Sequence, residues 1–194
     1  MRIVAGTLKG RRLNPPMNLP VRPTTDFAKE SLFNILRNRI DFEHSNALDL
    51  FCGTGNISFE FVSRGIKSIT SVDINQKCIT FIHQTKEKFK VDNIYPLRSD
   101  AFVYLGRSKM QFDVVFADPP YDMEKFDLVA ELVLKSFIAP DGWFILEHAK
   151  EHCYDTHPWF VEQRHYGKVN FSFFHRPLEE NSSQETIDAD QMSI

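Results

Sequence analysis

The chain has 194 residues, of which 42% are hydrophobic and 25% are charged. This length and composition are typical of one soluble globular domain. No apolar run approaches the roughly 20 residues that a membrane-spanning helix needs, and the apolar stretch at the N-terminus is too short for a secretory signal. The three cysteines lack the spacing of metal ligands, which favours a reduced, cytoplasmic setting with neither disulfide nor zinc.

The net charge of −3 conceals an uneven distribution. Residues 1–40 carry eight Lys and Arg against two acidic residues, whereas residues 176–194 carry one Arg against five acidic residues. A basic N-terminal part followed by an acidic remainder predicts one surface that binds phosphate groups and another that favours solubility. An ordinary solvated surface is the alternative interpretation.

The first 40 residues contain turn signals and one helix pattern. Short β-favouring runs broken by Gly6 and Gly10 predict a small basic hairpin over residues 2–13. Four prolines make residues 14–23 extended and irregular. A helix follows, and its candidate N-caps are Thr24, Thr25 and Asp26.

From about residue 46, strand patterns and helix patterns alternate. Strands are expected at 46–51, 68–73, 94–99, 112–117 and 142–147. Helices are expected between them at roughly 56–64, 75–90, 101–107 and 124–137. This alternation predicts right-handed crossovers and a mostly parallel sheet with helices on both faces. Two further strands, at about 159–166 and 169–175, are expected to pair as a hairpin and bring the sheet to seven strands.

The predicted fold is therefore a doubly wound α/β domain with a small N-terminal β-hairpin extension. We divide the chain into a basic extension at 1–23, the α/β domain at 24–176 and an acidic tail at 177–194. The tail lacks aromatic residues and is rich in acidic residues, Ser and Gln, which predicts disorder. Ligands of such folds bind at the carboxyl ends of the strands.

Acidic residues and a glycine turn follow the first three strands. Gly53 and Gly55 allow a tight turn and close approach of the backbone to a ligand, and Asp49 can accept hydrogen bonds from a ligand ammonium or order the loop itself. Asp73 stands 24 residues after Asp49, where an acid typically accepts from the ribose hydroxyls of an adenosine. Asp100 follows the third strand and could accept from an adenine amino group. The alternative is that each aspartate only caps the next helix.

A nicotinamide cofactor is a less favoured ligand for this turn. The dinucleotide fingerprint requires a third glycine three residues after Gly55, and Ser58 stands there. The sequence also offers no convincing acid for hydride transfer. An oxidoreductase is therefore disfavoured without being excluded.

The fourth strand ends in the motif Asp118-Pro119-Pro120-Tyr121. The two prolines fix φ and remove two backbone donors, so the turn is rigid and presents acceptors. The Asp118 carboxylate and the Pro119 carbonyl suit the two N–H groups of a planar amine, and Tyr121 offers a ring on which a base can stack. Hydrogen bonds from such an amine would return electron density to its nitrogen, which favours amino-group methylation without a metal. A purely structural turn is the alternative.

The two turns together resemble class I, Rossmann-like methyltransferases that act on amino groups. The N-terminal half is similar to the RsmD family through Arg2-Ile3-Val4-Ala5-Gly6, Gly10-Arg11-Arg12-Leu13, Arg22-Pro23-Thr24-Thr25-Asp26 and Glu30-Ser31-Leu32-Phe33. The likeness covers roughly residues 1–175 and includes Tyr166-Gly167-Lys168. Members of this family methylate the 2-amino group of one guanine in 16S rRNA of the small ribosomal subunit.

The resemblance implies S-adenosylmethionine as cofactor and a role for each motif. It implies cofactor contacts from Asp49, Phe51, Cys52, Gly53, Gly55, Asp73, Ile74, Asp100 and Ala101. It places the target base at Asp118, Pro119, Pro120 and Tyr121. It implies RNA contacts from Arg2, Lys9, Arg11, Arg12, Arg22, Thr24 and Asp26. Phe27 and Ala28 depart from the basic or polar surface expected beside these residues.

We expect a cytoplasmic monomer that acts on 16S rRNA, within an assembling small subunit and away from membranes. Two alternatives share the fold: an adenine amino-methyltransferase acting on DNA or RNA, and a non-catalytic RNA-binding protein. The chain has no obvious segment for recognising a DNA target, which favours RNA. Bases in RNA loops can be splayed out at modest cost.

Overall fold

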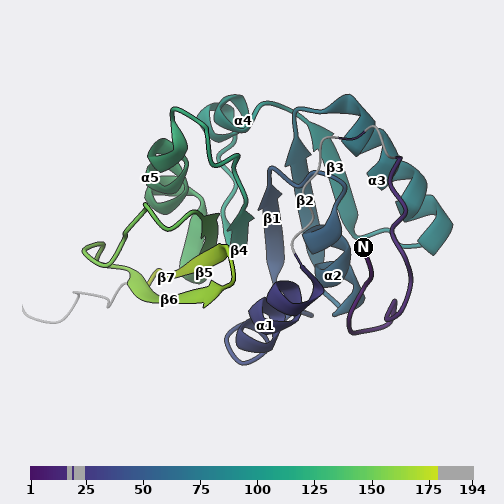
Figure 1. Cartoon of the computed structure of the whole chain (residues 1–194), viewed down its shortest axis with the longest axis horizontal. Helices are drawn as coiled ribbons and strands as arrows, with labels where there is room; N and C mark the ends of the chain where they lie inside the picture. The colour runs from purple at the N-terminus through teal and green to yellow at the C-terminus, as the bar shows by residue number, and fades with distance from the viewer. Residues whose placement is uncertain (17–18, 20–24, 179–194) are drawn as a thin grey trace, which may run out of the picture.

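The computed structural model describes residues 1–16, 19 and 25–178 (Figure 1). Its helices are α1 Asp26–Leu36, α2 Asn56–Ser63, α3 Gln76–Phe89, α4 Ala101–Arg107 and α5 Phe126–Ser136. Its strands are β1 Asn46–Leu50, β2 Ser68–Asp73, β3 Ile94–Arg98, β4 Phe112–Ala117, β5 Ile138–His148, β6 Phe160–Tyr166 and β7 Val169–His175. The predicted alternation of strands and helices is confirmed.

All seven strands form one sheet, in the order β3-β2-β1-β4-β5-β7-β6. Neighbours among β1 to β5 pair in parallel, whereas β7 pairs antiparallel with both β5 and β6. The expected hairpin of the last two strands is therefore present. The order of the strands reverses between β1 and β4, which creates the switch point at which α/β proteins bind ligands.

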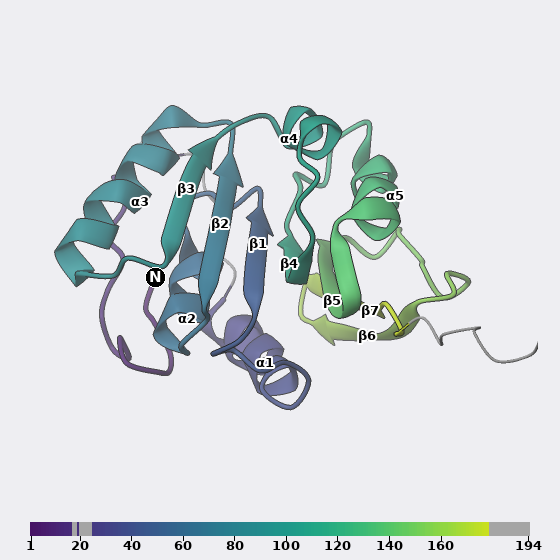
Figure 2. The ribbon, with the colours of Figure 1, turned by 180° about the vertical axis from the view of Figure 1, so that it is seen from behind.

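The two faces of the sheet carry two separate hydrophobic clusters. The first cluster joins side chains of α1, α2, α3 and the N-terminal segment to one face, and the second joins those of α4 and α5 to the other (Figure 2). Successive residues of β1 and β4 alternate between them: Ala47 and Val114 belong to the first cluster, Leu48 and Val115 to the second. This alternation follows from the two-residue period of a strand.

Strand β5 begins earlier than the sequence predicts. It starts at Ile138, directly after α5, and not at residue 142. A Pro-Asp-Gly sequence at 140–142 is typical of a turn and hides this part of the strand. The sheet accommodates these residues by an irregularity, because Phe112 pairs with Ile138 while Val114 already pairs with Trp143.

The N-terminal segment folds back on itself and packs on the domain. Its two arms are joined by an isolated antiparallel bridge between Arg2 and Arg12, so the expected hairpin takes the form of a turn with very little regular β-structure. Ile3, Leu8 and Leu13 are buried in the first cluster. The division at residues 23 and 176 stays a prediction, and the tail beyond residue 178 lies outside the described residues.

Candidate active site and nucleic-acid interface

The proposed site lies at the carboxyl edge of the parallel strands, where backbone hydrogen bonds connect neighbouring strand ends. The Cys52 amide donates to the Val72 carbonyl at 3.1 Å, which ties the glycine turn to β2. The Ser99 amide donates to the Asp73 carbonyl at 3.1 Å. The Asp118 amide donates to the Leu50 carbonyl at 3.4 Å. The residues predicted to bind the cofactor and the turn predicted to be catalytic therefore share one edge of the sheet.

The glycine turn after β1 depends on left-handed backbone. Gly53 and Gly55 have φ of 51° and 76°, and Phe51 has φ of 61° without being a glycine. At Gly55 a side chain would also crowd Ile82, with 3.1 Å between the added Cβ and Cγ1. The sequence around this turn therefore requires glycine for reasons of both conformation and space.

Cys52 and Asp49 are buried beneath this turn. Burial raises the pKa of the Cys52 thiol, assisted by the carboxylates of Asp49 and Asp73, so Cys52 is a packing residue and not an activated nucleophile. Asp49 is only 1% exposed and accepts a short hydrogen bond from Ser58 Oγ. Burial raises the pKa of Asp49 to about 7. Of the two roles open to Asp49, this position favours ordering the loop.

Asp73 holds the glycine turn and retains acceptor positions for further hydrogen bonds. Its Oδ2 accepts from the Gly53 amide at 2.8 Å and its Oδ1 from the Asn75 amide at 2.7 Å. A carboxylate has about four acceptor positions, so further donors such as ribose hydroxyls can be bound. The adjacent Ile74 is 63% exposed and offers an apolar surface to a planar base.

Asp100 caps α4, which is the alternative to ligand binding that the sequence left open for this residue. Both bonds of the cap fall on Oδ1, from the Phe102 amide at 2.9 Å and the Val103 amide at 3.0 Å. No hydrogen bond from a described residue reaches Oδ2, which leaves it able to accept from an adenine amino group. Capping and ligand binding are thus compatible here. The next residue, Ala101, is buried.

The Asp118-Pro119-Pro120-Tyr121 turn, predicted to be catalytic, follows β4 and contacts the end of β5. Asp118 is half-buried, Pro119 is buried and Pro120 is exposed. The hydroxyl of Tyr121 donates to Glu147 Oε1 at 3.2 Å, and Glu147 is itself 5% exposed. This bond fixes the orientation of the tyrosine ring. Glu147 is not among the predicted site residues, although an acid directly after the apolar residues of β5 is a usable signal.

The described candidates for RNA binding lie on or beside the N-terminal segment. Arg2 forms an ion pair with Asp26 at 3.4 Å, which neutralises part of its charge. Lys9 and Arg12 are exposed, and the guanidinium carbon of Arg11 lies 5.0 Å from the centre of the Phe89 ring. The remaining candidates, Arg22 and Thr24, lie outside the described residues. Of the three candidate N-caps of α1, Thr25 caps the helix, and its side chain accepts from the Ala28 amide at 3.2 Å.

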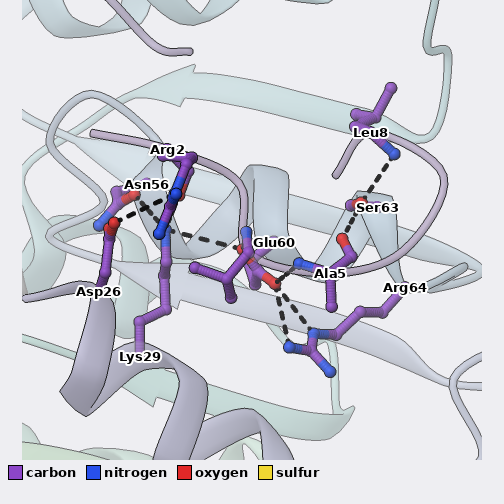
Figure 3. Close-up of polar contacts among 10 residues, drawn as sticks. Arg2, Ala5, Leu8, Asp26, Lys29, Asn56, Glu60, Ser63 and Arg64 are labelled. Carbon is purple, nitrogen blue, oxygen red and sulfur yellow. Dashed lines mark hydrogen bonds and ion pairs between the residues drawn. The ribbon is translucent and has the colours of Figure 1, made fainter. Parts of the chain in front are cut away.

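A buried charged cluster fastens the N-terminal segment to α1 and α2 (Figure 3). Lys29 Nζ donates to the Arg2 carbonyl at 2.6 Å and to Asn56 Oδ1 at 2.8 Å, and lies 3.6 Å from Glu60 Oε2. Burial lowers the pKa of Lys29, and the charge of Glu60 opposes that change. Asn56 follows the glycine turn directly, so one ammonium connects both predicted binding segments.

Glu60 completes this cluster from the middle of α2. Its carboxylate accepts from the amides of Val4 and Ala5 at 3.0 and 3.1 Å, and it pairs with Arg64 at 3.0 Å. Lys29 and Glu60 are fully buried. Sequence reasoning missed both residues, although a charged side chain within an apolar helix face is a recognisable signal.

The described ranges contain no helix that is both long and apolar enough to cross a membrane. The described part of the chain also contains no group of three or more His, Cys, Asp or Glu residues that could hold a metal ion.

Comparison with known proteins places these features in a family. Residues 1–175 match the family described as Conserved hypothetical protein 95. The candidate rRNA methyltransferase YlbH of Bacillus subtilis is 34% identical over 158 residues, covering 78% of this chain and 84% of that protein. The ribosomal RNA small subunit methyltransferase D of Buchnera aphidicola is 29% identical over 136 residues, covering 70% and 69%.

A solved structure shares the whole fold. The candidate methyltransferase yhhF of Escherichia coli superimposes with a TM-score of 0.81 at 23% identity, covering 92% of this chain and 99% of that one. The fold is thus that of class I methyltransferases. The chain belongs to the family of Conserved hypothetical protein 95, the RsmD family whose motifs its sequence carries.

Proposed function

We propose that the protein transfers a methyl group from S-adenosylmethionine to the 2-amino group of a guanine in 16S rRNA. The observation that carries this proposal is the Asp118-Pro119-Pro120-Tyr121 turn beside the glycine turn, joined by the bond between the Asp118 amide and the Leu50 carbonyl. Membership of the family and relatives named as rRNA methyltransferases support the reaction and the substrate.

The cofactor would lie along the carboxyl edge of β1, β2 and β3. Gly53 and Gly55 would approach its methionine part, in a loop that Asp49 orders. Asp73 would accept from the ribose hydroxyls beside the apolar side chain of Ile74, and Asp100 from the adenine. The remaining acceptor positions of both aspartates support this arrangement.

Bound S-adenosylmethionine supplies a methyl group that its sulfonium already activates. The protein's contribution is then to position the amine and stabilise the charge that develops on it. The Asp118 carboxylate and the Pro119 carbonyl would accept hydrogen bonds from the two N–H groups of the guanine amine. Tyr121, held by Glu147, would stack on the base. The amine nitrogen thereby gains the electron density that nucleophilic attack requires.

The substrate is proposed to be rRNA within an assembling small subunit, methylated by a monomer in the cytoplasm. The exposed cations of the N-terminal segment support contact with phosphates.

The deciding experiment is transfer of labelled methyl from S-adenosylmethionine to under-methylated small ribosomal subunits and, in parallel, to duplex DNA. The nucleosides are then digested and identified by mass. We expect label in 2-methylguanosine from the small subunit. Label in methyladenine from DNA would keep the mechanism and overturn the substrate, and no label in either would contradict the proposal.

A further inference from the structure

A shallow groove runs between the N-terminal segment and α3. Arg12 and Asn14 line one wall, and Phe81, Gln84 and Lys88 line the other. The two segments lie side by side in both views of the ribbon (Figures 1 and 2). The buried side chains of Leu13 and Phe89 form part of the lining, so both walls are anchored in the hydrophobic core.

The groove presents positive charge and hydrogen-bond donors. Arg12 and Lys88 stand on opposite walls, both exposed, and neither forms an ion pair with a residue of the described ranges. Asn14 and Gln84 add amide groups, and none of the described residues that line the groove carries a carboxylate. Its chemistry therefore fits an anion with several acceptor oxygens.

The wall on α3 continues toward the active-site edge. Lys77, Phe81, Gln84 and Lys88 are spaced by four, three and four residues, which places them along one face of the helix. Lys77 lies in the first turn of α3, two residues beyond Asn75, whose amide is bound by Asp73. A chain of phosphates lying on this face would therefore lead to the proposed cofactor edge.

The opposite wall is held in place by aromatic contact. The guanidinium of Arg11 lies over the Phe89 ring, the last residue of α3, at 5.0 Å from its centre. Such cation–π contacts are attractive, because the ring face carries partial negative charge. The charge of Arg11 therefore binds the N-terminal segment to α3, while Arg12 remains available to a ligand.

We propose that this groove binds the sugar-phosphate backbone of the RNA substrate, with Arg12 and Lys88 contacting phosphates. The face of α3 that carries Lys77, Phe81, Gln84 and Lys88 would extend the interface. The proposal rests on the proposed function and adds α3 to the RNA-binding surface. The positive charge of the groove complements the phosphates of RNA, and Lys77, Phe81, Gln84 and Lys88 are spaced along one face of α3. Both observations favour RNA over an apolar or cationic partner.

The test measures binding of the full chain to unmethylated 16S rRNA transcript over a range of salt concentrations. Each lost phosphate contact lowers the slope of log affinity against log salt by about 0.7–0.9. We expect Lys88→Ala to weaken binding several-fold at low salt and to reduce the slope by about this amount, and Lys88→Arg to restore it. The matched control is Lys135→Ala, an exposed lysine on α5 over the opposite face of the sheet, which should bind as the wild type does.

An unchanged salt slope for Lys88→Ala would overturn the groove as an RNA site, whatever the result of the methyl-transfer assay. Methyl transfer by Lys88→Ala at saturating RNA separates the two proposals. An undiminished rate at saturation with a raised KM for RNA supports the groove, whereas a lost rate with an unchanged KM contradicts it. Lys88-dependent binding of the transcript by the wild-type protein, together with no methyl transfer to under-methylated small subunits, would refute the proposed reaction alone.

Discussion

Asp118 combines a half-buried carboxylate with a backbone that two prolines hold rigid. Replacing it with Ala removes an acceptor from the proposed amine and should lower the rate of methyl transfer by about 10²–10³-fold, as loss of a preorganised electrostatic group does. Affinity for S-adenosylmethionine should change little, because Asp118 is assigned to the base. The assay pairs single-turnover methyl transfer with calorimetric binding of the cofactor.

Asp118→Asn is the matched control, since it retains one acceptor oxygen in the same shape and should keep more of the rate than Asp118→Ala. A large loss of cofactor affinity in either variant would contradict this division of roles.

Asp49 makes the stability of the ligand-free protein depend on pH. Its pKa is about 7 in the folded protein against a reference of 3.8, because burial disfavours the charged form. The folded state therefore retains a proton that the unfolded chain has released between these values. The contribution of Asp49 to stability should fall as pH rises through this window and stay constant above it.

Asp49→Asn should abolish this dependence, because an amide does not titrate in that range. The measurement is urea unfolding of both proteins at a series of pH values spanning the window. The free energy of unfolding of the wild type minus that of the variant should decrease with rising pH. A constant difference would show that Asp49 is not protonated in the folded protein.

At the scale of the elements, the N-terminal turn is fitted against the end of α2. Gly6 has φ of +80°, and a Cβ built there would lie 1.8 Å from the Ser63 carbonyl oxygen. Gly10 has nearly the same φ, +83°, with no atom within 4 Å of an added Cβ. Substitution of Gly10 therefore tests the free-energy cost of the backbone conformation alone. Substitution of Gly6 adds the cost of steric contact with α2.

Gly6→Ala should lower the free energy of unfolding more than Gly10→Ala does, because only Gly6→Ala forces the segment away from α2. The conformational cost common to both is about 1 kcal/mol. Thermal and urea unfolding measure the two variants side by side. Equal destabilisation would mean that the segment can shift from α2 without cost.

The sequence predicts the elements better than the contacts between them. The period of apolar residues indicated every strand and helix of the domain. The acids at strand ends predict which edge of the sheet binds ligands, and this stays a prediction. The early start of β5 escaped prediction because its Pro-Asp-Gly sequence is typical of turns. Lys29 and Glu60 escaped because their pairing joins segments about thirty residues apart in the chain, and charge alone favours exposure.

At the scale of the whole molecule, acidic and basic side chains are concentrated on different surfaces. The sheet gathers acidic side chains at the edge where we propose that the cofactor binds, while exposed cations follow the N-terminal segment and α3. An anionic RNA is thus attracted to one surface and repelled from the acidic remainder, which orients its approach before contact. Binding should accordingly weaken steeply with salt.

The buried cluster of Lys29 and Glu60 also determines how the molecule opens. Chain ends usually fray independently of the fold, but separating the first five residues from α2 would take the Arg2 carbonyl from Lys29 and the Val4 and Ala5 amides from Glu60. Leaving a buried polar group without its hydrogen-bond partner costs about 1–3 kcal/mol, and more when the group is charged. Amide protons of Ile3, Gly10 and Leu13 should therefore exchange with solvent in the same cooperative unit as α2, so the first residues of the chain behave as core.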